Sequence, residues 1–419
     1  MALSDFNFFD LDVFAHGTPY EALARLRREN PISWHAMSTP KRDDGFWLVT
    51  KHRDICQISE DTTLFYSHGG SVLADAPPRT APPALMMVRN GFAHLDPPKH
   101  TMYRRLITPS FAPRAIAALE QRIRTHAVQV LDRASALGNF EFVREIAVAL
   151  PIAVVFGEML GFDPSDFERA AYWASLFNRV HAIPPTDYEF GRIHEAAATA
   201  LNEMHVYALK AMYWRRENPA ADILSVLANM KTPDGQLISE EMFTSYFWSL
   251  ATAAFDTTAG TIAGGVLALN DFPAQCAKLC ANHSLVSTAV EEMLRWETPV
   301  IYFRRTASED TEIRGQKIRR GQRVVMCYAA ANRDDDVFQD PNVFDITREP
   351  NEHLAFGHGP HFCLGARVAR LEIRVLLEEM LRRRIHFKVC GGVTRERSNF
   401  INRIVRMPVA ISPFYNSEH

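Results

Sequence analysis

Apolar positions recur with helical spacing over most of the chain. From Lys99 to about Met230 they repeat every three to four residues, which is typical of amphipathic helices packed against a core. Shorter runs rich in aromatic and β-branched residues predict strands at Phe46–Thr50, Val300–Thr306 and Arg323–Tyr328. A strongly amphipathic segment from about Leu364 to Arg384 predicts one further helix. The pattern therefore predicts a mainly α fold with small β-sheets.

One stretch, from Met242 to Asn270, has Asp256 as its only charged residue. Its serines, threonines and glycines make it too polar for a membrane span, so we interpret it as one long helix buried inside a large protein. At about 1.5 Å per residue this helix would be roughly 40 Å long, enough to cross the whole molecule. Because no Gly/Ser/Pro-rich linker separates two halves, we expect residues 1–419 to form a single domain with no membrane span.

Composition and charge narrow the classes of partner. The chain has 419 residues with 46 Lys and Arg against 49 Asp and Glu, a net charge of -3. This balance provides no global basic field for nucleic acid or anionic membranes. The six cysteines include no Cys-x-x-Cys pair, and the N-terminus lacks a secretion signal. We therefore expect a cytoplasmic protein with reduced thiols that binds no nucleic acid.

A glycine-rich segment around one cysteine carries the clearest candidate chemistry. Residues 356–365 read Phe-Gly-His-Gly-Pro-His-Phe-Cys-Leu-Gly, directly before the last predicted helix. A thiolate of Cys363 would lie near the N-terminus of that helix, where N–H groups and the helix dipole lower a thiol pKa. Three interpretations compete: a structural cysteine, a zinc site of His358, His361 and Cys363 that lacks a fourth ligand, and an axial thiolate ligand of haem.

The segment resembles the haem-binding loop of the cytochrome P450 family, Phe-x-x-Gly-x-His/Arg-x-Cys-x-Gly. Phe356, Gly359, His361, Cys363 and Gly365 fill every fixed position. The resemblance implies the cytochrome P450 fold, with haem b between the central helix and the helix that follows the cysteine. It further implies that Cys363 is the iron ligand and that Phe356, His361 and Gly365 contact the cofactor.

A second family motif is Glu-x-x-Arg, present as Glu292-Met293-Leu294-Arg295. Residues three apart share one helix face, so Glu292 and Arg295 can form an ion pair. In the family a further arginine joins this pair, and Arg348 stands at the matching place. The resemblance implies a buried cluster of Glu292, Arg295 and Arg348 that holds the cysteine loop in position rather than taking part in chemistry.

Haem propionates require cations and hydrogen-bond donors. His100 and Arg104 are four residues apart on one predicted helix face. A solvated helix face is the simpler alternative for this pair. The family resemblance assigns His100, Arg104, Arg305 and His361 to the propionates. Strand alternation allows only one of the neighbours Arg304 and Arg305 to face inward.

The central helix supplies the candidate catalytic pair. An unpaired carboxylate at Asp256 would be costly among apolar neighbours, so the residue must be partnered or functional. The segment matches the family's Ala-Gly-x-Asp/Glu-Thr-Thr, with Ala254 in place of glycine, for which we expect a smaller local widening of the helix. In the family the acid relays protons and the threonine hydroxyl assists dioxygen activation, which implies catalytic roles for Asp256 and Thr257. A Thr257 hydroxyl bonded back to the i−4 carbonyl is compatible with that role.

The resemblance also implies the substrate and the partners. Residues 68–98 are loop-like, and we expect this loop to cover a pocket. The expected pocket residues are mostly apolar and come from this loop, the central helix, the strand after Glu-x-x-Arg and the last turn: Met86, Met87, Ser249, Thr252, Ala253, Val300, Ile301, Phe303 and Ile401. They predict an apolar small-molecule substrate such as a terpenoid, steroid or alkyl-aromatic compound. In the last turn Arg403 stands where relatives often have glycine.

The resemblance is strongest to bacterial members that receive electrons from a ferredoxin and its ferredoxin reductase. Arg104, Arg105, Arg367, Arg370 and Arg374 are candidates for a basic docking patch, although solvated helix charge explains the last two equally well. The expected activity is monooxygenation, the hydroxylation or epoxidation of the substrate. Two alternatives keep the haem: a non-hydroxylating enzyme (peroxygenase, coupling or dehydration) and a non-catalytic haem sensor.

Overall fold

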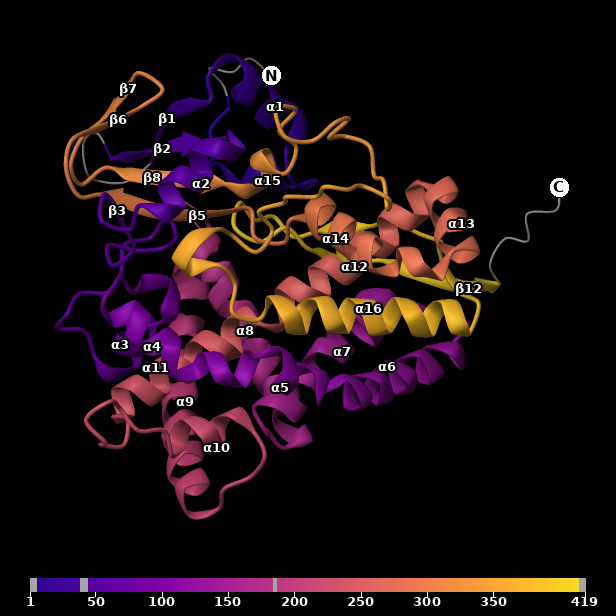
Figure 1. Ribbon diagram of the computed structural model, residues 1–419, viewed down its shortest axis with the longest axis horizontal. Helices are drawn as coiled ribbons and strands as arrows, with labels where there is room; N and C mark the ends of the chain where they lie inside the picture. Colours follow the sequence, from indigo (N-terminus) through magenta and orange to yellow (C-terminus); the bar gives the residue numbers. More distant parts are fainter. Residues whose placement is uncertain (1–5, 38–43, 184–186, 414–419) are drawn as a thin grey trace.

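The computed structural model of the protein describes residues 6–37, 44–183 and 187–413 (Figure 1). The fold is mainly helical with four small sheets in this part of the chain, so the predicted fold class is confirmed. The α-helices are α1 (Tyr20–Glu29), α2 (His52–Glu60), α3 (Pro83–Arg89), α4 (Lys99–Ile107), α5 (Pro113–Ala117), α6 (Glu120–Ser135), α7 (Ala149–Ile152), α8 (Phe167–Ala182), α9 (Phe190–Glu217), α10 (Ile223–Ala228), α11 (Glu240–Ala253), α12 (Phe255–Asp271), α13 (Pro273–Ala281), α14 (Val286–Glu297), α15 (Tyr328–Ala331) and α16 (Ala366–Arg382).

The strands form sheets from distant parts of the sequence. They are β1 (Ile32–Ala36), β2 (Gly45–Val49), β3 (Phe65–Tyr66), β4 (Asn139–Glu141), β5 (Tyr302–Ala307), β6 (Thr311–Ile313), β7 (Gln316–Ile318), β8 (Arg323–Cys327), β9 (Ile385–Val389), β10 (Thr394–Arg395), β11 (Ile404–Arg406) and β12 (Pro408–Pro413). The largest sheet has the order β1-β2-β8-β5-β3, in which only β2 and β8 are parallel neighbours. The others are β4-β12-β9, β10-β11 and β6-β7.

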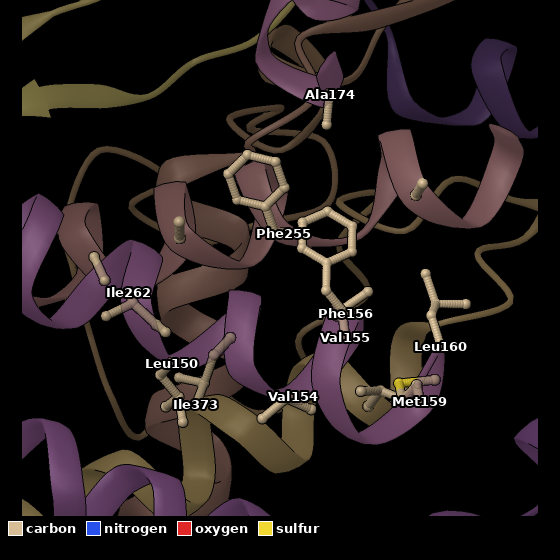
Figure 2. Packing of buried hydrophobic residues seen from close by; sticks show 14 of the residues in the cluster. Leu150, Val154, Val155, Phe156, Met159, Leu160, Ala174, Phe255, Ile262 and Ile373 are labelled. Carbon is tan, nitrogen blue, oxygen red and sulfur yellow. The ribbon is translucent and has the colours of Figure 1, made fainter. Parts of the chain in front are cut away.

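The main core surrounds α12. Leu150 of α7, Ile262 of α12 and Ile373 of α16 belong to one buried cluster, and Figure 2 shows them together. Phe255 at the start of α12 packs on Phe156 of a π-helical segment, Ala153–Met159, with ring centroids 5.8 Å apart. Figure 1 shows α16 running across the molecule beside α12 and α14. This packing places the segment before α16, which holds Cys363, close to the middle of the central helix.

The prediction of a single central helix is wrong. The helix is interrupted at Ala254, between α11 and α12. The hydroxyls of Thr257 and Thr258 donate to the carbonyl oxygens of Ala253 (3.0 Å) and Ala254 (3.2 Å). Such bonds compete with backbone N–H groups for the same carbonyls and bend helices. The alanine at position 254 therefore does not prevent a local break in the helix.

The segment of residues 68–98 is not loop throughout, since it contains α3 and a 3-10 turn, Phe92–His94. Proline at the first position of α3 starts that helix with a fixed φ and without losing a hydrogen bond. None of the helices in the described part of the chain has both the length and the apolar character needed to cross a membrane.

Candidate active site

One cavity brings together most of the predicted site residues. It is enclosed by α11 and α12, by the segment around Cys363, by β5 and by the turn Phe92–His94. His100, Arg104, Arg305, His361, Phe356, Gly365 and Cys363 line it, and so do Thr257 and much of the predicted substrate pocket. The site therefore joins elements that are far apart along the chain.

The loop before α16 is shaped by its glycines. Gly357 and Gly359 have φ of +70° and +68°, which only glycine adopts readily. A Cβ at Gly359 would also lie 2.7 Å from the carbonyl oxygen of Ser59. The backbone N–H of Cys363 donates to the carbonyl of Phe356 (2.9 Å), which closes the loop and turns the thiol into the cavity.

The Cys363 thiol has a different pKa direction from the one expected. Burial raises its pKa, and this effect outweighs the hydrogen bonds from the N–H groups of Gly365 and Ala366 and the charge of Arg104, which act in the opposite direction. The expectation that the helix terminus alone lowers the pKa is therefore corrected. A thiolate here needs a further positive partner within the cavity, which is the role of an iron ion.

The zinc alternative is not supported by the geometry. His358 bonds to Glu60 (2.7 Å), whereas the ring of His361 packs on that of His100 with centroids 4.1 Å apart. In the described residues, the only His, Cys, Asp or Glu group compact enough for a metal ion is Asp334, Asp335 and Asp336. The three side chains around Cys363 therefore do not converge on a common ion.

Two cations in the cavity lack an anionic partner. Arg305 is 3% exposed, and its Nε has no hydrogen-bond partner, while Nη1 donates to the carbonyl of Arg304 (2.8 Å). Burial lowers the pKa of Arg305, and it also lowers the pKa of Arg104. Neither guanidinium has an ion pair with a described side chain. Because buried cations require anions, their arrangement fits the two carboxylates of a haem group.

The two histidines at this end of the cavity are neutral donors or acceptors. Burial, together with nearby Arg104, lowers the pKa of His100 to about 4. Burial and the charge of Arg305 lower the pKa of His361 well below its usual value. Gly365 lines the same cavity, and a Cβ there would meet nothing within 4 Å. The residues present thus fit a flat dianionic group beside Cys363.

Strand alternation separates Arg304 from Arg305. Arg304 turns to the other side of β5, where it donates to the carbonyls of Gly69 (2.8 Å) and Leu73 (2.9 Å) and pairs with Asp75 (3.0 Å). Arg305 is thereby the strand residue that faces the cavity, as the alternation predicts.

The Glu-x-x-Arg residues form a buried cluster with Arg348. Glu292 Oε1 and Oε2 accept from Arg295 Nη2 (2.7 Å) and Nε (2.8 Å), and Arg348 Nε lies 3.2 Å from Glu292 Oε2. Arg295 also donates to the carbonyls of Asn332 and Pro341, both at 2.9 Å. These bonds tie α14 to the long segment between α15 and the cysteine loop. A neighbouring pair, Glu291 and Arg370, links α14 to α16 with two bonds of 2.7 Å.

Asp256 and Thr257 point in different directions. Thr257 lines the cavity, with its hydroxyl bonded to Ala253. Asp256 is 1% exposed and does not line the cavity; it accepts from Asn178 Nδ2 (2.7 Å) and forms an ion pair with Arg403. The carboxylate is therefore partnered. The sequence marked Arg403 only as a departure from the family pattern, and nothing local connects it with Asp256.

Six of the nine predicted pocket residues lie on the cavity wall, and three do not. Ser249, Thr252, Ala253, Val300, Phe303 and Ile401 line the cavity. Met86, Met87 and Ile301 do not: Met87 and Ile301 are buried in core clusters, and Met86 is half-buried in α3 outside the cavity wall. Helix formation at α3 and the pleat of the chain at Ile301 turn these side chains into the core.

Sequence reasoning missed several cavity residues, among them His94, His181, Trp248 and Glu372. Glu372 of α16 is 1% exposed, burial raises its pKa well above the usual value, and its Oε2 has no partner. A regular heptad-like helix face offers no signal that one of its acids is buried. Only the packing of α16 reveals it.

Comparisons with known proteins agree with this geometry. The cytochrome P450 family model matches residues 68–411. The chain is 35% identical to linalool 8-monooxygenase of Pseudomonas putida over 407 residues, 96% of this chain and 98% of that protein. It is 34% identical to steroid C26-monooxygenase of Mycolicibacterium smegmatis over 407 residues, 96% of this chain and 92% of that protein.

A solved structure shows the same likeness in three dimensions. The cytochrome P450 of Mycobacterium marinum in complex with pseudoionone matches with a TM-score of 0.86 and 34% identity, over 98% of this chain and 100% of that chain. Fold, site geometry and sequence all lead to the same class of haem-thiolate enzyme with a cysteine-ligated iron. The chain belongs to the cytochrome P450 family and is a cytochrome P450 monooxygenase.

Proposed function

We propose that the protein hydroxylates or epoxidises an apolar small molecule of terpenoid, steroid or alkyl-aromatic type, with dioxygen and electrons from a ferredoxin and its reductase. The observation that carries this proposal is the single cavity that joins Cys363, the unpaired Arg104 and Arg305, and Thr257 to a largely apolar wall. The names of the terpene and steroid monooxygenases among the relatives support the substrate classes.

Cys363 is the iron ligand in this proposal, and His100, Arg104, Arg305 and His361 hold the haem carboxylates. The bound haem supplies the activation of dioxygen and the transfer of one oxygen atom to the substrate. The N–H groups of Gly365 and Ala366 donate to the sulfur and so tune how strongly it donates electrons. Phe356 packs under Arg370, 4.5 Å from the ring centroid to the guanidinium carbon, and keeps the loop closed.

Thr257 and Asp256 deliver protons in this proposal. The Thr257 hydroxyl lines the cavity beside the break in the helix, and with haem bound it would donate a hydrogen bond or a proton on the side where dioxygen is activated. Asp256 lies on the other side of α12, within reach of Asn178 and Arg403, and passes protons from the protein exterior toward Thr257. Thr258, whose hydroxyl is bonded to Ala254, supports the helix break.

Only two of the five candidate arginines support a basic docking patch. Arg370 pairs with Glu291, and Arg374 pairs with Glu120 (2.8 Å) and Glu378 (2.9 Å), so their charges are compensated. Arg104 faces the cavity. Arg105 and Arg367 are exposed and form no ion pair with a described residue, which supports a contact with an acidic ferredoxin at this face. Charge reversal at both, to Glu, is expected to slow electron transfer more at low than at high salt.

Two further parts of the proposal concern the whole chain. Residues 1–419 act as one catalytic domain, because the cavity draws on residues from Ser71 to Ile401. The site of action is the cytoplasm, which the six free cysteines support. Fractionation of the native cells with an antibody against the chain tests the second point.

The ferrous carbon monoxide spectrum tests the haem-thiolate assignment. The folded, haem-loaded protein is expected to show the red-shifted thiolate band, and Cys363→Ala is expected to abolish it. Cys390→Ala, at an exposed cysteine far along the chain, is the matched control and keeps the band. Absence of the band in the folded wild type, or its persistence in Cys363→Ala, overturns the proposal.

Labelled dioxygen separates the alternatives. A monooxygenase incorporates one labelled atom into product while it consumes NAD(P)H through ferredoxin reductase and ferredoxin. A peroxygenase takes its oxygen from peroxide instead, and coupling or dehydration leaves no label in the product. A haem sensor shows no turnover with any reductase.

A further inference from the structure

Two buried polar atoms in the cavity wall have no hydrogen-bond partner. They are Nδ1 of His94 and Nε1 of Trp248. Both side chains line the cavity, and they are only 4% and 6% exposed. Their rings are 6.3 Å apart between centroids, so the two polar atoms belong to one region of the cavity wall. Because a buried donor without a partner is costly, these atoms indicate a ligand atom that pairs with them.

The two side chains are held in place independently of any ligand. His94 ends the turn Phe92–His94, and its Nε2 lies 3.3 Å from the hydroxyl of Ser71. Trp248, in α11, lies against Gly91, where a Cβ would come within 2.5 Å of the indole. Phe177 packs edge-on against the same indole, with centroids 6.4 Å apart. The free polar atoms therefore belong to rigid groups that are oriented before a substrate binds.

The charge around these atoms restricts the ligand. Burial lowers the pKa of His94 to about 3, and the nearby His181, Arg304, Arg89 and Arg305 act in the same direction, so its imidazole is neutral. The only acidic side chain on the described cavity wall is Glu372, which comes from α16 beside the cysteine loop. A cationic amine thus finds no counter-ion near His94. A carboxylate finds neutral donors at this point, because Arg304 is already paired with Asp75 and Arg305 is assigned to the haem carboxylates. Arg89 donates to the carbonyl of Pro77 and does not line the cavity.

Hydrogen-bond chemistry narrows the ligand further. The indole N–H of Trp248 is a donor only, so the ligand atom must be an acceptor. The His94 Nδ1 donates if Ser71 donates to Nε2, and it accepts in the other tautomer. A carbonyl oxygen satisfies the first arrangement and a hydroxyl satisfies either. We propose that Trp248 Nε1 and His94 Nδ1 bind a neutral carbonyl or hydroxyl oxygen of the substrate, which is therefore an oxygenated apolar molecule rather than a hydrocarbon, an acid or an amine.

The position of this site along the helix also determines where the substrate is oxidised. Trp248 lies in α11, and Thr257 lies nine residues later in α12, beyond the break at Ala254. With its oxygen at Trp248 and His94, a substrate presents its opposite end to Thr257 and the iron ligand. We therefore expect oxidation at a carbon remote from the existing oxygen. This inference rests on the proposed monooxygenase function and names the substrate class for the same cavity.

A matched series of ligands tests the inference on the haem-loaded, full-length protein. Limonene, perillaldehyde, perillyl alcohol and perillic acid share one carbon skeleton and differ in the polar group. Dissociation constants come from the low-to-high-spin absorbance shift, a binding signal that needs no turnover. One hydrogen bond accounts for roughly a tenfold difference, so the aldehyde or alcohol is expected to bind about tenfold more tightly than limonene.

Variants assign the preference to the two side chains. Trp248→Phe keeps an aromatic ring and removes the N–H; it should reduce the preference over limonene to within about threefold. His94→Phe should do the same. Trp173→Phe is the control: its indole bonds to Glu203 (3.1 Å) outside the cavity, and the preference should stay. If Trp248→Phe fails to retain the thiolate carbon monoxide band, His94→Phe provides the test.

Several results overturn the inference. One is that both variants weaken the binding of limonene and of the alcohol equally. Another is that perillic acid binds most tightly of the four compounds. The third is that none of the four compounds shifts the spectrum. Each result counts only if it is measured on protein that shows the thiolate carbon monoxide band. Loss of that band in the wild type contradicts the proposed function itself, so the two failures are distinguishable.

Discussion

Asp256, in the first turn of α12, is ion-paired with Arg403, which lies 147 residues later in the chain. The same carboxylate accepts a hydrogen bond from Asn178 of α8. Arg403 in turn lies 2.5 Å from Glu396, so the guanidinium bridges two acids. The pair joins three segments, α8, α12 and the C-terminal strands, around the acid that we place in the proton path.

Removal of Arg403 is expected to destabilise the fold. Asp256 is 1% exposed, so Arg403→Gln leaves a buried carboxylate without its counter-ion and lowers the free energy of unfolding by about 3 kcal/mol. Urea denaturation of the variant measures the change. Arg192→Gln, in a mostly exposed pair with Glu189, is the control and should change the value by less than about 1 kcal/mol. Equal effects in both variants would show that the buried pair contributes no more than a surface pair.

Thr257→Ala is expected to uncouple electron use from product formation. Without its hydroxyl, proton delivery to the reacting oxygen slows, so more peroxide is released for each NAD(P)H consumed, with roughly a tenfold lower coupled rate. The ratio of peroxide to product measures this. Thr125→Ala, in α6 and outside the cavity, removes a hydroxyl with the same kind of bond, to the carbonyl of Gln121 (3.0 Å), and should keep coupling near the wild-type value. An identical peroxide yield in Thr257→Ala and the wild type would exclude the assigned role.

Arg305→Leu is expected to stabilise the haem-free protein and to weaken the binding of haem. Arg305 is buried with no carboxylate partner, so its replacement should stabilise the haem-free protein by about 1–3 kcal/mol. The same change removes a counter-ion of the haem carboxylates and should speed haem loss about tenfold or more. Unfolding of the haem-free form and haem transfer to apomyoglobin measure the two effects. Arg105→Leu, at an exposed site, should change neither, and a haem loss rate in Arg305→Leu equal to that of wild type contradicts the assignment.

Glu291 is expected to contribute stability that depends on pH. Burial raises the pKa of this carboxyl, but the bonds to His353 and Arg370 and the charges of these partners together outweigh burial and lower the pKa to about 2. Since the folded pKa lies below the unfolded one, the contribution is complete above about pH 4.5 and is lost as the pH falls toward 2. With its partial exposure taken into account, it amounts to about 1–2 kcal/mol.

Glu291→Gln tests this contribution. The difference in unfolding free energy between wild type and variant should be constant from about pH 5 to 7 and shrink steadily below about pH 4.5. Urea denaturation over that range measures it, with Glu312→Gln at a site without a resolved ion pair as the control. A difference that does not vary with pH would show that the stabilisation does not come from the charge of Glu291.

Much of the fold and the site was predictable because it is encoded over short distances. The loop at Cys363 and the pair Glu292 and Arg295 each lie within one loop or one helical turn, where residue spacing determines which side chains meet. The alternation of β5 likewise separates Arg305 from Arg304. The prediction of one unbroken central helix was wrong at Ala254, where threonine hydroxyls compete for the backbone carbonyls. No local pattern placed Met87 in the core rather than on the cavity wall.

The sequence by itself determined the family, the iron-ligand loop and the acid–alcohol pair, because these are short motifs with fixed spacing. Only the tertiary structure decided that Arg403 is the partner of Asp256, and that His94 and Trp248 leave two free polar atoms in one wall. These residues lie 147 and 154 positions apart in the chain, and no local periodicity relates them. Packing of separate helices and strands brings such pairs together, and no short motif encodes these long-range contacts.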